Sequence, residues 1–296
     1  MTSLLAGLAS PINALLAVLT LLTGGYVIGW SRLENGPTAG AMGVGWLTNF
    51  LDTLGIGSFA TTTSMWRAFK MVPDRVIPGT LNVGHTLPTV AEALIYTAII
   101  PVDVTTLISM IAAAVLGAWL GAGLVAKWPK RYVQIGMGLA LLAAATLFFM
   151  TAMKLFPGGG DALGVRGVKL IVAIAGNLLL GALMSLGIGL YAPCMILVSL
   201  LGMSPTAAFP IMMGSCAFLM PVGSLKFIKE GAYDRAAALG LAIGGIPGVL
   251  IAAYIVKSMP LTYVRWLVIV VVLYTSVTML YSAFSQRSAV GDNASA

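Results

Sequence analysis

Residues 170–225 read LIVAIAGNLLLGALMSLGIGLYAPCMILVSLLGMSPTAAFPIMMGSCAFLMPVGSL and contain no aspartate, glutamate, lysine or arginine in 56 positions. A helix that crosses a bilayer needs about 20 apolar residues, so this stretch is long enough for several membrane segments joined by buried turns. Its prolines and glycines divide it into predicted helices at 168–188, 190–202 and 205–225. The middle helix would be roughly 20 Å long, short of the ~30 Å hydrocarbon core, so we expect it to end inside the membrane.

The composition of the whole chain is that of a membrane protein. Of 296 residues, 16 are lysine or arginine and 9 are aspartate or glutamate, while 59% are apolar. Charged side chains supply most of a soluble exterior, so this composition excludes a soluble enzyme, a nucleic-acid-binding protein and a disordered chain. Cys194 and Cys216 lie inside the long apolar stretch and are expected to be buried thiols.

Charge-free runs predict the remaining membrane segments. The region 38–98 divides like the stretch above, into helices at 38–56, 58–71 and 76–98, and full spans are predicted at 11–31, 104–126, 132–153, 236–256 and 266–286. No positive region precedes the first span, so we expect a retained helix and not a cleaved signal. In this topology eleven lysines and arginines lie on one side and five on the other. Cytoplasmic loops carry the excess of positive charge, which predicts a bacterial inner-membrane protein with its N-terminus outside and its C-terminus inside.

The two halves of the chain resemble each other at an offset of 131 or 132 residues. Leu54-Gly55-Ile56-Gly57 recurs as Leu186-Gly187-Ile188-Gly189. Pro73, Pro78 and Tyr132-Val133 likewise match Pro205, Pro210 and Tyr263-Val264. Each repeat holds five segments, an odd number, so the halves must enter the membrane from opposite sides. We therefore predict an all-α inverted-topology repeat with broken half-helices: an extra N-terminal transmembrane helix within 1–35, repeat 1 at 36–155, a loop at 156–167, repeat 2 at 168–285 and a flexible tail at 286–296.

The two LGIG breaks are the predicted substrate site. Inverted repeats place their sites near the bilayer midplane, between broken helices at matching positions, and the N-terminus of a half-helix offers backbone N–H groups and partial positive charge to an anion. The residues from which we predict a substrate site are Asn49, Gly57, Ser58, Thr61, Thr62, Asn82, Gly189, Tyr191 and Cys194. The alternatives are that the glycines only permit close packing, which we prefer for Gly117, Gly121, Gly244 and Gly248, and that the hydroxyls bond to carbonyls of their own helix.

Asp52 and His85 are the predicted proton-coupling residues. Both lie inside apolar segments, where an ionisable side chain is costly and marks a pathway or a proton relay. The alternatives are that Asp52 caps a helix and that His85 hydrogen-bonds a carbonyl. Glu92 lies nearer a segment end and could be an edge carboxylate. Trp66 with Arg67 is expected to anchor the membrane interface.

The second half also carries motifs of a known family. It has Gly187-Ile188-Gly189 leading to Pro193, then the run Leu201–Ala208, then Gly214-Ser215-Cys216-Ala217. With these motifs the chain resembles the TauE/SafE family of sulfite and organosulfonate transporters over about 40–284. The first half departs from the family at Ser58–Ser64, where a Gly-rich turn is usual. The resemblance implies transport of a small sulfur-containing or carboxylate anion, in either direction.

The sequence thus favours a secondary transporter over catalysis. A P-loop motif and a cysteine–histidine cluster with metal-ligand spacing are both missing from the sequence, so we predict no ATP, metal or other cofactor. The expected partners are a small anion and membrane lipid, not nucleic acid, and homo-oligomerisation is left open. The alternatives are a passive anion channel, a scaffold subunit, and an intramembrane serine protease that uses Ser58 with His85.

Overall fold

The computed structural model describes residue 18 and residues 36–155, 159–187, 189–254 and 262–292. The first half of this part of the chain contains α3 (Ala39–Thr53), α4 (Ser58–Phe69), the 3-10 turn η1 (Asp74–Val76), α5 (Ile77–Ile99), α6 (Val104–Val125) and α7 (Lys130–Ala152). The second half contains α8 (Val168–Met184), α9 (Tyr191–Leu200), the 3-10 turn η2 (Pro205–Ala207), α10 (Ala208–Lys229), α11 (Arg235–Tyr254) and α12 (Thr262–Asp292). The predicted N-terminal span at 11–31 falls, apart from Val18, outside the described residues.

The protein is an all-helical, multi-pass membrane protein. In the described residues the elements are all helices or 3-10 turns, and four of the helical segments are long and apolar enough to cross a bilayer. These four are Val104–Val125, Lys130–Ala152, Pro205–Lys229 and Arg235–Tyr254. α12 continues to Asp292, so the first residues of the predicted tail at 286–296 are helical.

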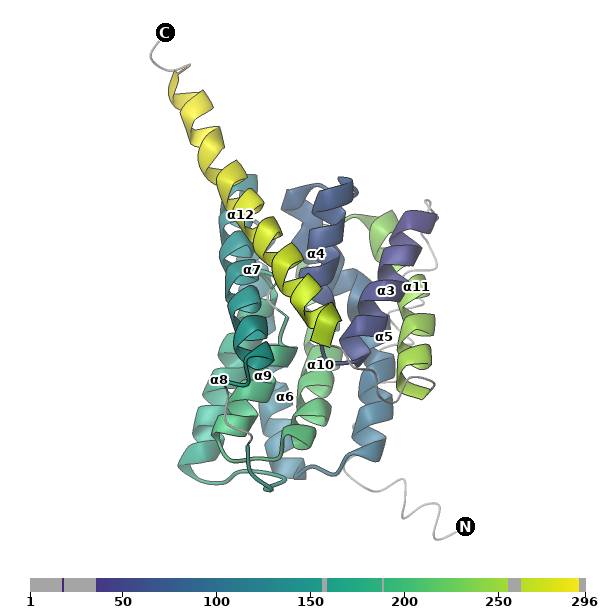
Figure 1. Cartoon of the computed structure of the whole chain (residues 1–296), viewed down its shortest axis with the longest axis vertical. Coiled ribbons are helices and arrows are strands. Elements are labelled where there is room, and N and C mark those ends of the chain that lie inside the picture. The colour runs from purple at the N-terminus through teal and green to yellow at the C-terminus, as the bar shows by residue number, and fades with distance from the viewer. Residues whose placement is uncertain (1–17, 19–35, 156–158, 188, 255–261, 293–296) are drawn as a thin grey trace.

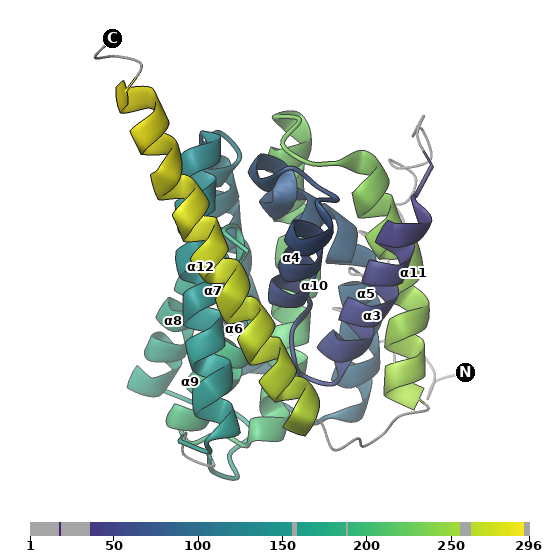
Figure 2. The ribbon, with the colours of Figure 1, turned by 45° about the horizontal axis from the view of Figure 1, so that its top comes forward.

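Two short helices lie where the sequence predicts them. α4 has 12 residues and α9 has 10, so they are roughly 18 and 15 Å long and neither can cross the hydrocarbon core. Glycines end the preceding helices, because Gly55, Gly57 and Gly187 have φ of 86°, 90° and 90°, a region that side chains with a Cβ rarely adopt. In both views α4 lies toward the end of the molecule from which α12 projects, and α9 lies toward the opposite end (Figures 1 and 2).

Each main helix pair combines one helix from the first half of the chain with one from the second half. α3 packs on α11 and α8 packs on α6, while α5 and α10 pack on each other at the centre, and α7 packs on α12. A Cβ at Gly117 would overlap the carbonyl of Leu178 in α8, and a Cβ at Gly248 would overlap the carbonyl of Trp46 in α3. These glycines therefore allow the close helix packing that we expected of them.

The central helix α5 carries a polar interior. Its buried side chains include Thr80, Asn82, His85, Thr86, Thr89, Glu92 and Thr97, whereas the buried side chains of α10 are mostly apolar. A polar side chain at membrane depth is stable only with hydrogen-bond partners, so the partners of α5 indicate where the functional chemistry lies.

Candidate functional site

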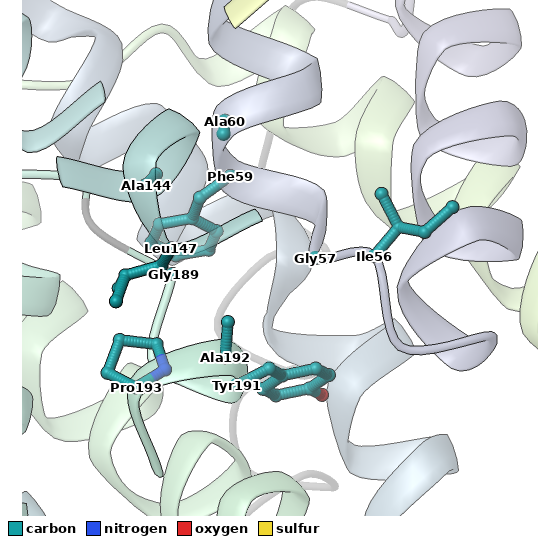
Figure 3. Close-up of a pocket in the computed structure, with 10 residues that line it drawn as sticks. All are labelled: Ile56, Gly57, Phe59, Ala60, Ala144, Leu147, Gly189, Tyr191, Ala192 and Pro193. Carbon is teal, nitrogen blue, oxygen red and sulfur yellow. The ribbon is translucent and has the colours of Figure 1, made fainter. Parts of the chain in front are cut away.

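The two helix breaks meet in one pocket. Its walls come from both halves of the chain: Asp52, Gly57, Ser58, Phe59 and Thr89 from the first, and Met184, Gly189, Leu190, Tyr191 and Cys216 from the second. An adjoining pocket lies on the side of α7 and is lined by Ala144, Leu147, Ala192 and Pro193 together with residues of both breaks (Figure 3). The two breaks that the sequence places at the substrate site therefore lie side by side.

The shared pocket is small. The centre of a water molecule has about 10 Å³ to occupy there and about 20 Å³ in the adjoining pocket. One water needs roughly 10–15 Å³ on this measure, so each pocket holds about one water molecule.

Asp52 caps the first short helix. Its Oδ1 accepts a hydrogen bond of 2.9 Å from the backbone N–H of Ser58, the first residue of α4, and its side chain also lines the pocket. The carboxylate therefore lies at the positive end of the α4 dipole. In the second half Met184 takes the place of Asp52, and among the described residues no side chain caps the start of α9.

His85 is held by two neutral partners. Its Nδ1 lies 3.0 Å from Oδ1 of Asn49 and its Nε2 lies 3.0 Å from Oγ1 of Thr62. Since the Asn49 amide nitrogen donates to the Gly45 carbonyl, Oδ1 is the acceptor and Nδ1 carries a proton, whereas the bond between Nε2 and the Thr62 hydroxyl can run in either direction. The ring is fully buried, and an imidazolium buried without a carboxylate partner would be costly, so we expect the imidazole to be neutral.

The proposed pairs of His85 are not formed in this conformation. Among the described residues, neither Asp52 nor Ser58 hydrogen-bonds the ring, because Asn49 and Thr62 occupy both nitrogens. The ring of Phe59 lies against the imidazole, 5.7 Å between centroids, and itself lines the pocket. The serine–histidine pair of a protease therefore lacks its base at Ser58.

Several other residues predicted at the site use their side chains in hydrogen bonds to nearby backbone carbonyls. The hydroxyl of Thr61 donates to the carbonyls of Gly57 and Ser58, and the amide of Asn82 donates to the carbonyl of Pro78. Cys194 lies on α9, is fully buried and lines neither pocket. Of the predicted substrate residues, those that line a pocket are Gly57, Ser58, Gly189 and Tyr191.

Trp66 does not anchor the interface. Its side chain is fully buried, so the expected contact with lipid head groups is wrong. Arg67 instead forms an ion pair with Asp74, and Gln134 of α7 donates to the same carboxylate oxygen at 2.8 Å.

Glu92 is not the edge carboxylate that its position near a segment end allowed. It is fully buried, its Oε1 accepts a 2.7 Å hydrogen bond from the hydroxyl of Thr53, and its Oε2 accepts a 2.6 Å hydrogen bond from the hydroxyl of Tyr191. It therefore joins the end of α3 to the beginning of α9. His85, Thr89 and Glu92 follow one another at spacings of four and three on one face of α5, which is the signal in the sequence that could have located it.

Comparison with known proteins supports the resemblance seen in the sequence. The family model described as "Sulfite exporter TauE/SafE" matches residues 169–295, which contain α8 to α12. No curated protein and no solved structure matches the chain. The TauE/SafE resemblance is therefore confirmed over the second half, and it indicates a membrane transporter of the sulfite-exporter type.

Proposed function

We propose that this protein is a secondary transporter that moves a small sulfur-containing anion, such as sulfite or an organosulfonate, across a bacterial cytoplasmic membrane. In this proposal two inverted repeats, at 36–155 and 168–285, alternate around a central site. The observation that carries it is the pocket lined by both helix breaks, with one uncapped helix N-terminus, on α9, facing it.

The order and packing of the elements support the inverted repeat. At offsets of 131 or 132, α3 to α7 correspond one by one to α8 to α12, and η1 corresponds to η2. The packing of α3 on α11 corresponds to that of α8 on α6, and α10 on α6 corresponds to α5 on α11. Two halves that are related by such an exchange can trade conformations, which is the basis of alternating access.

The chemistry of the pocket fits a small oxyanion. The N-terminus of α9 supplies N–H groups and partial positive charge without the cost of a buried cation. The hydroxyl of Thr89 makes no hydrogen bond within the part of the chain that the structure describes, and it is 2% exposed and lines the pocket.

The distribution of charge supports the orientation. The described basic residues gather at one end: Arg67, Lys70, Arg75, Lys127, Lys130, Arg131, Lys226, Lys229 and Arg235. Fewer lie in the described loops and helix ends of the opposite side: Lys154, Arg166, Lys169 and Arg265. By the positive-inside rule the first end is cytoplasmic, and the described end of α12 lies there.

The test is transport by the purified protein in proteoliposomes. We expect saturable uptake of radiolabelled sulfite or a sulfonate, and counterflow when the vesicles are preloaded with unlabelled substrate. A channel would give unsaturable, gradient-only flux with no counterflow. Vesicles that accumulate none of the sulfite, sulfonate and carboxylate probes above protein-free vesicles would reject the proposal.

Two variants of α5 connect the transport to the pocket. Thr89→Val keeps the shape of the side chain and removes the unpaired hydroxyl, so the apparent KM should rise by roughly tenfold, as for a lost substrate hydrogen bond of about 1.4 kcal/mol. The matched control is Thr86→Val, one turn away, whose hydroxyl bonds to the Asn82 carbonyl and does not line the pocket. Equal KM values for the two variants would remove Thr89 from the site.

A further inference from the structure

The pocket presents a difficulty for an anion. Asp52 lines it, Glu92 lies one hydrogen bond behind its wall at Tyr191, and neither pocket is lined by a lysine or an arginine. Like charges at close range in a low-dielectric interior repel strongly, so an anion cannot share the site with two ionised carboxylates. A positive charge must therefore arrive with the anion.

Charged groups on the surrounding helices do not supply it. α3 contributes only Asp52, and the basic residues of α4, α10 and α11 are Arg67, Lys226, Lys229 and Arg235, at the helix ends away from Glu92. The other titratable groups facing this region are His85 and Tyr96 on α5, Tyr191 and Cys194 on α9, and Cys216 on α10. His85 bonds only to the neutral side chains of Asn49 and Thr62, and an imidazolium buried without a carboxylate partner is costly, so the positive charge is expected to come from outside the protein.

The two carboxylates differ in the donors that hold them. Asp52 accepts from the backbone N–H of Ser58, which can only donate and therefore fits an ionised carboxylate. Glu92 accepts from the hydroxyls of Thr53 and Tyr191, and a hydroxyl can either donate or accept. Glu92 can thus gain a proton and keep both partners, because the hydroxyl of Thr53 can accept from the new O–H while Oε2 still accepts from Tyr191.

We propose that Glu92 is a proton-binding site that couples anion movement to proton movement, with one proton carried on its carboxylate for each anion bound. This inference rests on the proposed function. The ionised carboxylate holds Tyr191, the first residue of α9, at 2.6 Å, the short distance of a hydroxyl bonded to a charged oxygen. When a proton from water binds an Oε atom, the charge-assisted bond becomes a weaker neutral one, and the start of α9 is released.

The release of Tyr191 acts directly on the substrate site. Tyr191 lines both pockets, so its movement with α9 changes the wall that the anion contacts (Figure 3). A proton fits this place better than a metal ion. Both oxygens of Glu92 are already bonded, hard cations need about six oxygen ligands, and no group of acidic, cysteine or histidine residues suited to a metal is found among the described residues.

The decisive experiment compares accumulation with exchange in proteoliposomes whose membrane potential is clamped at zero. For one proton per univalent anion, a gradient of one pH unit should drive roughly tenfold accumulation in the wild type. Glu92→Gln keeps the shape of the side chain but cannot ionise. It should lose this accumulation while exchanging labelled for unlabelled anion within about threefold of the wild-type rate, and independently of pH. The matched control, Glu230→Gln in the loop after α10, should behave as wild type.

A second measurement does not depend on a variant. Binding of the anion to wild-type protein in weakly buffered detergent solution should take up one proton per anion, seen with a pH dye. Accumulation by Glu92→Gln equal to that of the wild type, or anion binding with no proton uptake, would overturn the inference. A sodium gradient that drives accumulation in place of the pH gradient would also overturn it. If the wild type neither binds nor transports any anion, the proposed function itself fails.

Discussion

Asp52 and Met184 hold equivalent positions before the two breaks, and this difference gives the pocket its electrical asymmetry. The carboxylate of Asp52 occupies the anion-binding end of α4, while the end of α9 stays uncapped. A substrate anion is therefore expected to bind α9 and to be repelled by Asp52, which holds it on one side of the pocket.

Asp52→Asn tests this asymmetry. The amide oxygen can still accept from the Ser58 N–H, but the negative charge is gone, so the anion should bind several-fold more tightly at a cost of about 1 kcal/mol in stability from the weaker cap. Calorimetric titration with substrate, together with thermal unfolding in detergent, measures both effects. Unchanged affinity would show that the charge of Asp52 does not reach the bound anion.

His85 is expected to act on stability and not on coupling. His85→Ala leaves Oδ1 of Asn49 and the hydroxyl of Thr62 unpaired in the protein interior and opens a cavity, so unfolding should become easier by about 2–4 kcal/mol. The transport that remains should keep the pH profile of the wild type. Thr86→Val serves as a stability control on the same helix, and a changed pH profile in His85→Ala would return the histidine to the proton pathway.

Sequence patterns identify some of the residues that line the pockets and miss others for a physical reason. Glycines with positive φ mark the two breaks at Gly57 and Gly187, so the segments around them could be located. Which face of a helix points into a pocket depends on tertiary packing. The sequence therefore predicts Thr61 and Cys194 at the pocket, which they do not line, and omits Thr89, which does line it. Glu92 looked peripheral because its partners, Thr53 and Tyr191, come from other segments.

At the level of the helices, the turn before each short helix sets where that helix begins and points. Gly57 has φ 90° and ψ 133°, and the N–H of the next residue bonds to Asp52. This backbone conformation aims the start of α4 at the pocket, and a residue with a Cβ reaches it only with strain.

Gly57→Ala should therefore cost about 1–3 kcal/mol in stability and reduce transport more than its effect on folding explains. Gly43→Ala is the matched control. Gly43 lies within α3, a Cβ there would meet no atom within 4 Å, and alanine favours a helix, so this variant should be neutral or slightly more stable. Transport assays and thermal unfolding on both variants decide the matter, and equal behaviour of the two would mean that the turn is not constrained.

Element boundaries were predictable to within a few residues because charge, proline and glycine end membrane helices by direct physical effects. α5 differs from the other long helices in its polarity. It is 23 residues long, which is enough to cross a bilayer. Its buried threonines, Asn82, His85 and Glu92 make it too polar to be recognised as a span by hydropathy. Burial of Trp66 could not be foreseen either, because a tryptophan near a helix end is suited both to lipid head groups and to a protein core.

At the scale of the whole molecule, polar contacts fix the outer ends of both short helices. Arg67 of α4 pairs with Asp74, which also accepts from Gln134 of α7. At the opposite end Lys169 donates to the carbonyl of Leu201, just beyond α9, at 2.9 Å. Near it Arg166 donates to both oxygens of Asp103, at 2.6 and 2.7 Å, and holds the pKa of that carboxyl well below its usual range.

The contacts at the two ends differ in strength, and this difference should set the resting conformation. Arg67 and Asp74 are each only 16% exposed, so their pair is little screened by water, whereas the side chain of Arg166 is 63% exposed. The protein should therefore rest closed at the end that carries Arg67, which the proposed orientation makes cytoplasmic, and opening there requires the pair to break.

Asp74→Asn should shift the population toward the form that is open to the cytoplasm. Loss of a largely buried pair worth about 1 kcal/mol changes the ratio of the two forms roughly fivefold. Ser58→Cys, in a background where Cys194 and Cys216 are replaced by alanine, gives a single thiol at the pocket for a membrane-impermeant reagent. Its labelling from the cytoplasmic face should speed up about fivefold in Asp74→Asn and stay unchanged in the control Asp161→Asn, whose carboxylate is exposed at the other end. Faster labelling from the outer face instead would reverse the assignment of the closed end, because a thiol at the midplane reports whichever side the pocket has opened to.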